Sequence, residues 1–274
     1  MKPDRPLNIA VCISTQSRTW ATGVPSLLSF FSSPIHKYHF LGHTWDKNSW
    51  KPGYHREYTI EQLNIDELRQ SMLSKIPFTA LRIDEQHDRP YTMAHNDETF
   101  YTWLPMLKSF MLSNNLKTQY EIENDMTFDL VVHTRWDLAY HPGTKFDNFI
   151  PREIVPDELY CYRSYFPAEY RMPFIDDIIY FGSSRTLDII DSFYHYYSTN
   201  KFFEMTSVSQ YNNAFYHVGV GVLLYKWATL KNIKFNELKT ERLEGLYPAV
   251  IRQPVAGAQW PEEHDKIVHA YRTY

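Results

Sequence analysis

The chain opens with a pattern that predicts a strand, a turn and a helix in succession. Residues 7–13 (LNIAVCI) form a short apolar run rich in β-branched side chains, as in a strand buried on both faces. A polar turn from Ser14 to Arg18 follows and leads into a weaker helical pattern through Leu28 and Phe31. This succession is typical of the first unit of an α/β nucleotide-binding fold.

The same alternation continues to residue 230. Apolar runs predict further strands at 39–45, 80–83, 128–132, 158–162 and 177–181. Helical spacing predicts helices at 60–76, 99–116, 185–197 and 212–230, and Ser183 or Ser184 is placed to cap the third of these. Residues 47–58 contain the turn signal Pro52-Gly53 and are expected to form a loop.

These elements predict a single α/β domain of the Rossmann type over residues 1–274. No repeat, low-complexity segment or linker interrupts the chain. We expect a mainly parallel twisted sheet flanked by helices, because strands alternate with helices. Residues of about 7–140 would form its nucleotide-binding part, and residues of about 141–274 its acceptor side.

Composition narrows the class of protein. Hydrophobic residues make up 43% of the chain and charged residues 22%, which is ordinary for a globular protein and argues against disorder. A net charge of −4 gives no sign of a nucleic-acid partner. Aromatic residues make up 16%, which suits a large core and also the flat platforms on which sugars and nucleobases stack.

The expected compartment is the cytoplasm. Cys12 and Cys161 are too few for a disulfide framework, so a reducing environment fits best. The first residues lack the apolar core of a signal peptide, and no stretch approaches the roughly 18 apolar residues of a membrane helix. We therefore expect a soluble protein without a membrane span.

The triplet Arg135-Trp136-Asp137 follows the clearest of the predicted strands, residues 128–132 (FDLVV). Ligands of open α/β sheets collect beyond the carboxyl ends of the strands, so we take all three as candidate donor-binding residues. Asp137 is also the candidate ligand of a divalent cation, Mn²⁺ or Mg²⁺, which would bridge a diphosphate. The alternative is an Arg–Asp ion pair that caps the strand.

Other candidates are spread along the chain. In the first turn, Ser14, Gln16 and Arg18 offer polar groups to a diphosphate, although the turn lacks a glycine-rich fingerprint and the lysine of a P-loop. His217, beside two glycines, is a candidate second metal ligand, or else a structural histidine.

Asp176 and Asp177 form a pair of adjacent carboxylates at the start of the predicted strand 177–181. Either they belong to a turn and bond to their own backbone, or they supply a general base or bind acceptor hydroxyls. Asp177 is preferred as the catalytic residue, because it opens the strand and alternation places it on the opposite face from Asp176.

The order of these motifs resembles a group of bacterial and viral polysaccharide-type glycosyltransferases with the GT-A fold. In that group, a strand of the type "YD-apolar-apolar-x-x-R-x-D" carries the counterpart of the Asp-x-Asp metal motif. Here Phe128-Asp129 stands at its start, with Arg135 and Asp137 at its end. A later "D-x-apolar-x-x-G-S" segment resembles residues 176–183, and the resemblance covers about residues 7–225.

The resemblance implies transfer of a sugar from a nucleoside diphosphate sugar to a glycan or another hydroxyl acceptor. It also implies a divalent cation, but Arg135 stands at the first position of the Asp-x-Asp motif and leaves Asp137 as its carboxylate. Two other functions stay open. A sugar nucleotidyltransferase would need a glycine-rich basic loop after the first strand, and a non-catalytic glycan-binding or degenerate transferase would bind without nucleotide.

Overall fold

The computed structural model describes residues 5–17, 19–50, 59–86, 98–140, 143–166, 172–199, 219–238 and 249–250. The strands are β1 (Asn8–Ser14), β2 (Lys37–Trp45), β3 (Lys47–Trp50), β4 (Thr59–Gln62), β5 (Phe78–Asp84), β6 (Leu130–Arg135), β7 (Leu138–Ala139), β8 (Glu158–Phe166), β9 (Met172–Gly182), β10 (Lys234–Glu237) and β11 (Ala249–Val250). The helices are α1 (Trp20–Phe30), α2 (Ile65–Leu73), α3 (Glu98–Glu123), α4 (Ser184–Asp191), α5 (Phe193–Ser198) and α8 (Gly219–Leu230), with a 3-10 turn η1 (Phe146–Asn148).

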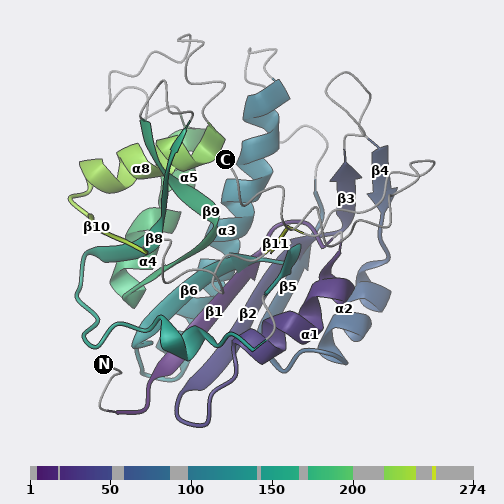
Figure 1. Ribbon diagram of the computed structural model, residues 1–274. Coiled ribbons are helices and arrows are strands. Elements are labelled where there is room, and N and C mark those ends of the chain that lie inside the picture. Colours follow the sequence, from purple (N-terminus) through teal and green to yellow (C-terminus); the bar gives the residue numbers. More distant parts are fainter. Residues whose placement is uncertain are drawn as a thin grey trace.

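A seven-stranded, mostly parallel sheet runs through the protein (Figure 1). Its strand order is β10-β8-β9-β6-β1-β2-β5, and within it only β9 runs against its neighbours. Two small antiparallel pairs, β3–β4 and β7–β11, stand apart from it. The predicted fold class, an α/β protein with a mainly parallel sheet between helices, is confirmed.

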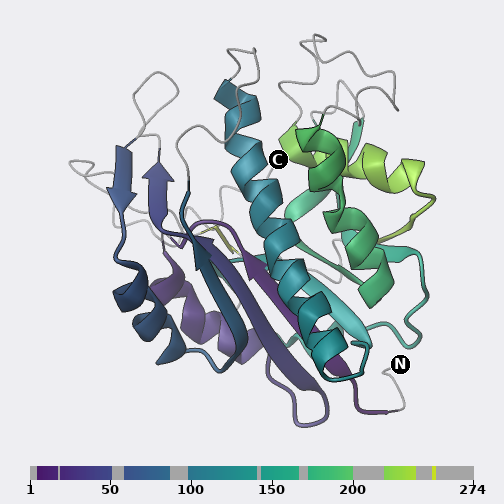
Figure 2. The same ribbon diagram turned by 180° about the vertical axis from the view of Figure 1, so that it is seen from behind.

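Helices cover both faces of the sheet, which a parallel sheet needs because its strands are apolar on both sides. α1 and α2 lie on the face turned toward the viewer in Figure 1, and α3, α4 and α5 cover the face seen in Figure 2. Alternate residues of β1 divide between the two cores. Ile9 and Val11 belong to the core under α1, whereas Ala10 and Cys12 belong to the core under α3.

Most predicted elements are confirmed, although α3 runs on to Glu123 and β9 begins already at Met172. Residues 212–218 of the last predicted helix lie outside the described residues. Three other predictions are wrong in part. Of the expected loop 47–58, residues 47–50 form β3 and pair with β4. The helix expected at 60–76 starts only at Ile65, because Asn64 accepts the N–H groups of Asp66 and Glu67 and caps α2. The helix expected at 185–197 is divided at Ser192 into α4 and α5, with Ser183 as the N-cap of α4.

The described aromatic side chains fill the cores. Phe30 stacks on Tyr140 with ring centroids 4.2 Å apart, and Trp227 packs against Phe193 and Tyr196. The exposed large apolar side chains of the described chain are all aliphatic: Ile35, Leu73, Ile122 and Leu230. The high aromatic content is therefore explained by packing in this part of the protein, and not by surface platforms.

No described helix is both long and apolar enough to span a bilayer. Cys12 and Cys161 are both buried and no disulfide links them.

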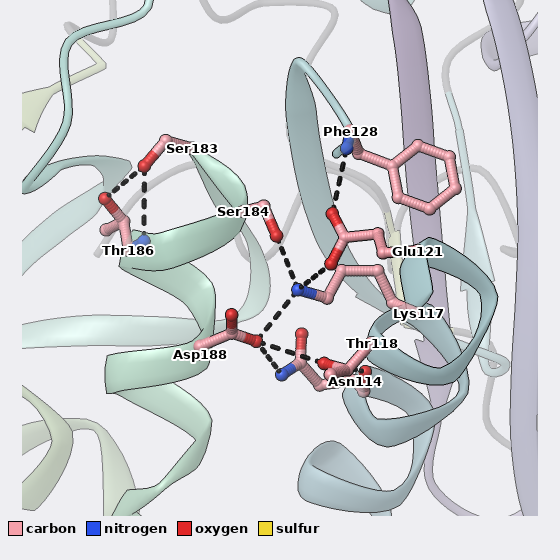
Figure 3. Close-up of polar contacts among 9 residues, drawn as sticks. All are labelled: Asn114, Lys117, Thr118, Glu121, Phe128, Ser183, Ser184, Thr186 and Asp188. Atoms are coloured by element: carbon pink, nitrogen blue, oxygen red, sulfur yellow. Dashed lines mark hydrogen bonds and ion pairs between the residues drawn. The ribbon is translucent and has the colours of Figure 1, made fainter. Parts of the chain in front are cut away.

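A buried charge cluster joins α3 to α4 (Figure 3). Lys117 has a fully buried side chain, and its ammonium lies 2.9 Å from Glu121 and 2.8 Å from Asp188. It also donates a hydrogen bond to Ser184. Burial acts to lower the pKa of Lys117, but the two carboxylates outweigh it and raise the pKa above its usual value, so the lysine stays charged.

Two buried histidines make the stability of the fold dependent on pH. Burial lowers the pKa of both His39 and His43 below the usual 6.5. The unfolded chain then binds more protons than the folded one at acid pH, so the free energy of unfolding should fall as the pH drops below about 6.5 and recover above it. Urea unfolding at about pH 7.5 and about pH 5.5 measures this change.

His39→Leu is the matched variant for this test. His39 packs between Tyr120 and Phe128, and its Nε2 is buried with no hydrogen-bond partner in the described chain. Leucine fills the same apolar space without a titrating group. The variant should therefore lose less stability between the two pH values, and an unchanged pH slope would contradict the assignment to His39.

Candidate functional site

The candidate site lies at the carboxyl ends of β1, β2 and β6. β2 and β5 extend the sheet on one side of β1, whereas β6 lies on its other side, so the strand order reverses at β1. The register pairs Ile13 with Gly42 on one side and Ser14 with Arg135 on the other. The turn after β1 and the residues after β6 therefore meet at a topological switch point, where open α/β sheets bind ligands.

Arg135 and Asp137 form a bidentate ion pair at this edge. Arg135 Nε donates to Asp137 Oδ1 at 2.9 Å, and Arg135 Nη2 donates to Asp137 Oδ2 at 2.7 Å. The Arg135 side chain is 18% exposed and that of Asp137 11% exposed. The pair predicted as the structural alternative does form, and it is largely shielded from solvent at the carboxyl end of β6.

Trp136, between them, points into the core. The residue is only 2% exposed, and its indole N–H donates to the carbonyl of His43 at 2.8 Å. Its ring lies so close to Gly42 that any β-carbon at that position would collide with it. A ring enclosed in this way does not offer a face to a sugar or a base. Trp136 instead anchors the backbone on which Arg135 and Asp137 stand.

Helix α1 packs closely against the residues that follow β6. A β-carbon at Gly23, the fourth residue of α1, would collide with the carbonyl oxygen of Leu138 and come within 3.3 Å of that of Trp136. Glycine thus permits a backbone approach that any larger residue would prevent. The first turn of α1 is thereby held beside the residues that follow β6.

The turn after β1 is strained, and a hydrogen bond to a buried side chain of α3 holds it in place. Thr15 has φ of 84°, in the left-handed region that β-branched residues rarely adopt. Its N–H donates to the buried hydroxyl of Ser109 at 2.8 Å, and that hydroxyl is hydrogen-bonded to Nδ1 of His43 at 2.7 Å. Gln16 contacts Gln86 at 3.2 Å. Arg18, predicted to bind the donor, lies outside the described residues.

Ser14 faces inward. It is fully buried, and its hydroxyl is hydrogen-bonded to His133 Nε2 at 2.9 Å. The other nitrogen of His133 bonds to the Tyr180 hydroxyl, which donates to Asp191 at 3.1 Å. Ser14 is therefore part of a polar chain under the site, across β1, β6, β9 and α4.

The sequence interpretation missed both of these hydrogen-bond networks, the one at His43 and the one at His133. Their members come from distant segments, so spacing along the chain gives no sign that they meet. A signal was nevertheless present, because His43 and His133 are polar residues within predicted buried strands, at positions that face α3. A buried polar residue in such a strand needs a partner, and that need points to a network.

Asp176 and Asp177 lie inside β9, so the alternative of a turn is wrong, and so is the expectation that Asp177 opens the strand. The pairing of β8 with β9 skips here, from Cys161↔Tyr180 to Arg163↔Ile175. Ile178 and Ile179 both belong to the core under α1, so the alternation that favoured Asp177 over Asp176 is broken just after them. The side chains of the two aspartates lie outside the described part.

The backbone of β9 reaches the candidate site. Thr134, next to Arg135, donates its hydroxyl to the carbonyl of Ile178 at 3.2 Å. Asp177 therefore lies, by chain connectivity, within one residue of the end of β6.

The carboxylates at the ends of β2 and β5 have structural partners. Asp46 accepts the N–H of Gln86 at 2.7 Å and the side-chain amide of Gln62 at 2.8 Å. Asp84 is held by Arg82 through two bonds of 2.8 and 2.9 Å. Burial acts to raise the pKa of Asp84, but His43 and Arg82 outweigh it and lower the pKa, so this carboxylate stays charged.

The described residues do not by themselves fit the divalent cation that the resemblance implies. Both oxygens of Asp137 accept from Arg135, and in the described ranges no three His, Cys, Asp or Glu side chains converge. His217 lies outside these ranges, so its role as a ligand stays a prediction. A cation at Asp137 would need oxygen ligands from elsewhere.

No family model matches the chain, and no curated protein sequence matches it significantly. Among solved structures, the glycosyltransferase GlyE from Streptococcus pneumoniae TIGR4 has a TM-score of 0.40 and 11% sequence identity over 86% of this chain. The chain spans 46% of the length of that structure.

Proposed function

We propose that this protein is a glycosyltransferase that moves a sugar from a nucleoside diphosphate sugar to a glycan or another hydroxyl acceptor. The observation that carries the proposal is the meeting of two polar segments at the switch point of the sheet. There Arg135 lies opposite Ser14 in the register, with the strained turn at Thr15 next to it. A guanidinium at the carboxyl edge of a parallel sheet suits a diphosphate.

The charge that develops in the reaction explains why such a site would be useful. The bond from the anomeric carbon to the diphosphate breaks, and the nucleoside diphosphate leaves with the electron pair. The acceptor oxygen forms the new bond, and its proton passes to a base. Arg135 would stabilise the leaving diphosphate, Gln16 and Arg18 would add donor contacts, and Asp177 or Asp176 would accept the proton.

A thermal-shift panel of nucleoside diphosphate sugars, followed by an assay of released nucleoside diphosphate, tests the proposal. A donor at about 100 times its Kd stabilises the folded state by about 2.7 kcal/mol. For a chain of this size, that raises the melting temperature by several degrees. Release of nucleoside diphosphate should then depend on an added hydroxyl acceptor.

The rival functions predict different results in the same experiment. A glycan-binding protein would be stabilised by glycans alone and by no nucleotide. A sugar nucleotidyltransferase would consume a nucleoside triphosphate and a sugar phosphate and release pyrophosphate. Either result would replace the proposed transfer reaction.

A further inference from the structure

His43, near the carboxyl end of β2, joins the two segments that meet at the switch point. Its carbonyl accepts the indole N–H of Trp136 at 2.8 Å, and its ring nitrogen Nδ1 is hydrogen-bonded to Ser109 of α3 at 2.7 Å. Ser109 Oγ in turn accepts the N–H of Thr15 at 2.8 Å. His43 and Ser109 are both fully buried, so these bonds form away from bulk water. One histidine therefore connects the turn after β1 with the segment after β6.

The hydrogens of this network can be assigned from the groups themselves. The N–H of Thr15 can only donate, so the Ser109 oxygen accepts, and the Ser109 hydroxyl is left to donate to His43 Nδ1. His43 must then carry its proton on Nε2, which lies 3.4 Å from a carboxylate oxygen of Asp84. Burial lowers the pKa of His43, which keeps the ring neutral at pH 7. Donors and acceptors therefore match from His43 to Thr15.

Thr15 needs this support because its conformation is unfavourable. A φ of 84° costs a β-branched residue free energy, and it persists only where the surrounding structure holds it. A turn that merely connected β1 to α1 would avoid this cost by relaxing or by placing glycine there. Backbone strain of this kind gathers at ligand sites. The strain therefore indicates that the shape of the turn serves more than the connection.

The shape of the turn decides which of its residues face the site. Ser14 and Ser17 are buried, whereas Thr15 and Gln16 are half-buried. Within residues 14–17, Thr15 and Gln16 are therefore the ones that a ligand beyond the end of β1 can reach. A threonine hydroxyl and a glutamine amide can each donate a hydrogen bond to a phosphate or sugar oxygen.

We propose that Ser109 is a positioning residue of the site: supported by His43, it holds Thr15 in the left-handed conformation, and the turn held in this way binds the donor through Thr15 and Gln16. The inference rests on the proposed function, since it assumes a nucleoside diphosphate donor at this edge. Ser109 is fully buried and acts through Thr15, without touching the ligand itself.

Hydrogen exchange at the Thr15 amide tests the positioning without any ligand. Ser109→Ala removes the oxygen that accepts this N–H, so the amide should exchange about tenfold faster or more in NMR spectra of ¹⁵N-labelled protein. Ser113→Ala is the matched control, because Ser113 is another fully buried serine of α3 and its hydroxyl donates to the Phe110 carbonyl at 2.9 Å. This control should leave exchange at Thr15 unchanged.

Calorimetric titration tests the consequence for binding. The probe is whichever of UDP, GDP, CDP and ADP gives the largest thermal shift, titrated in a buffer that contains Mn²⁺. Ser109→Ala should raise the Kd by about threefold to tenfold, the weight of one neutral hydrogen bond. Ser113→Ala should raise it by less than about twofold, since it removes a bond inside the helix only.

Two further comparisons show whether Ser109 acts through Thr15. Glycine adopts a positive φ without strain, so Ser109→Ala should change the Kd less in a Thr15→Gly background than in the wild type. His43→Asn keeps an acceptor near the position of Nδ1, whereas His43→Leu removes it, so the first variant should bind more tightly than the second. A serine that served only the packing of α3 would produce neither difference.

The outcomes distinguish the inference from the proposed function. If the Thr15 amide exchanges no faster in Ser109→Ala, the serine does not hold the turn, and the inference is overturned while the transferase stands. The same follows if exchange rises but the Kd stays that of the wild type. If none of the four nucleotides binds the wild type, the nucleoside diphosphate donor is excluded, and both proposals fall together.

Discussion

Lys117→Met is expected to lower the free energy of unfolding by about 3–5 kcal/mol, the usual cost of removing one partner from a buried ion pair. Lys117 is fully buried and lies between Glu121 and Asp188 (Figure 3). Methionine has a similar length, so little cavity forms, but the 11% exposed Glu121 loses its counter-ion. Because Asp188 is 44% exposed and partly solvated, the loss should lie toward the lower end of this range.

Urea unfolding followed by circular dichroism measures this loss, with Lys37→Met as the control. Lys37 is an exposed lysine at the start of β2, and its replacement should change stability by about 0.5 kcal/mol or less. A Lys117→Met variant as stable as the control would mean that an apolar side chain replaces the ammonium without loss. The charge cluster would then not be what fastens α3 to α4.

Asp177→Asn is expected to lower turnover by roughly two to four powers of ten while leaving donor affinity intact, the usual contribution of a general base. Its backbone lies in β9, beside the end of β6, where Thr134 bonds to Ile178. Asp176→Asn must be measured alongside, because the broken alternation of β9 no longer favours one aspartate over the other. The expected pattern is a large loss in one variant and a small loss in its neighbour.

A transfer assay beside a donor-binding titration separates catalysis from binding. Asp157→Asn is a matched control, since Asp157 has φ of 62° and asparagine tolerates that conformation as well as aspartate does. The control should keep wild-type turnover. If Asp176→Asn and Asp177→Asn both do so too, neither aspartate is the base, and the proton must pass to another group or to water.

Local pattern was enough to predict the order of most elements of the main sheet and to point to the edge of the candidate site. Strands β1 and β6 are apolar runs whose ends are marked by polar residues, and the caps Asn64 and Ser183 act on N–H groups only two or three residues away. Such features depend on neighbours in the chain, so they can be derived from the sequence. The position of Arg135 and Asp137 at the carboxyl end of β6 followed from the same reasoning.

Which role each site residue takes depended on contacts that only the folded chain makes, some of them between distant segments. The sequence allowed Asp137 to hold a cation or to pair with Arg135, and only the folded backbone brings both carboxylate oxygens against the guanidinium. Trp136 is turned inward because β2 offers it the space above Gly42. Ser14 meets His133 across a separation of 119 residues.

The break in β9 also belongs to the tertiary structure. A regular strand alternates its faces, so the sequence alone places Asp176 and Asp177 on opposite sides. The pairing of β9 with β6 covers only Ile179 to Gly182, and the skip lies beyond it, where the register with β8 shifts between Tyr180 and Ile175. Amino-acid preferences therefore determine which segments become strands and helices, whereas packing between those segments decides which side chains reach the edge of the sheet.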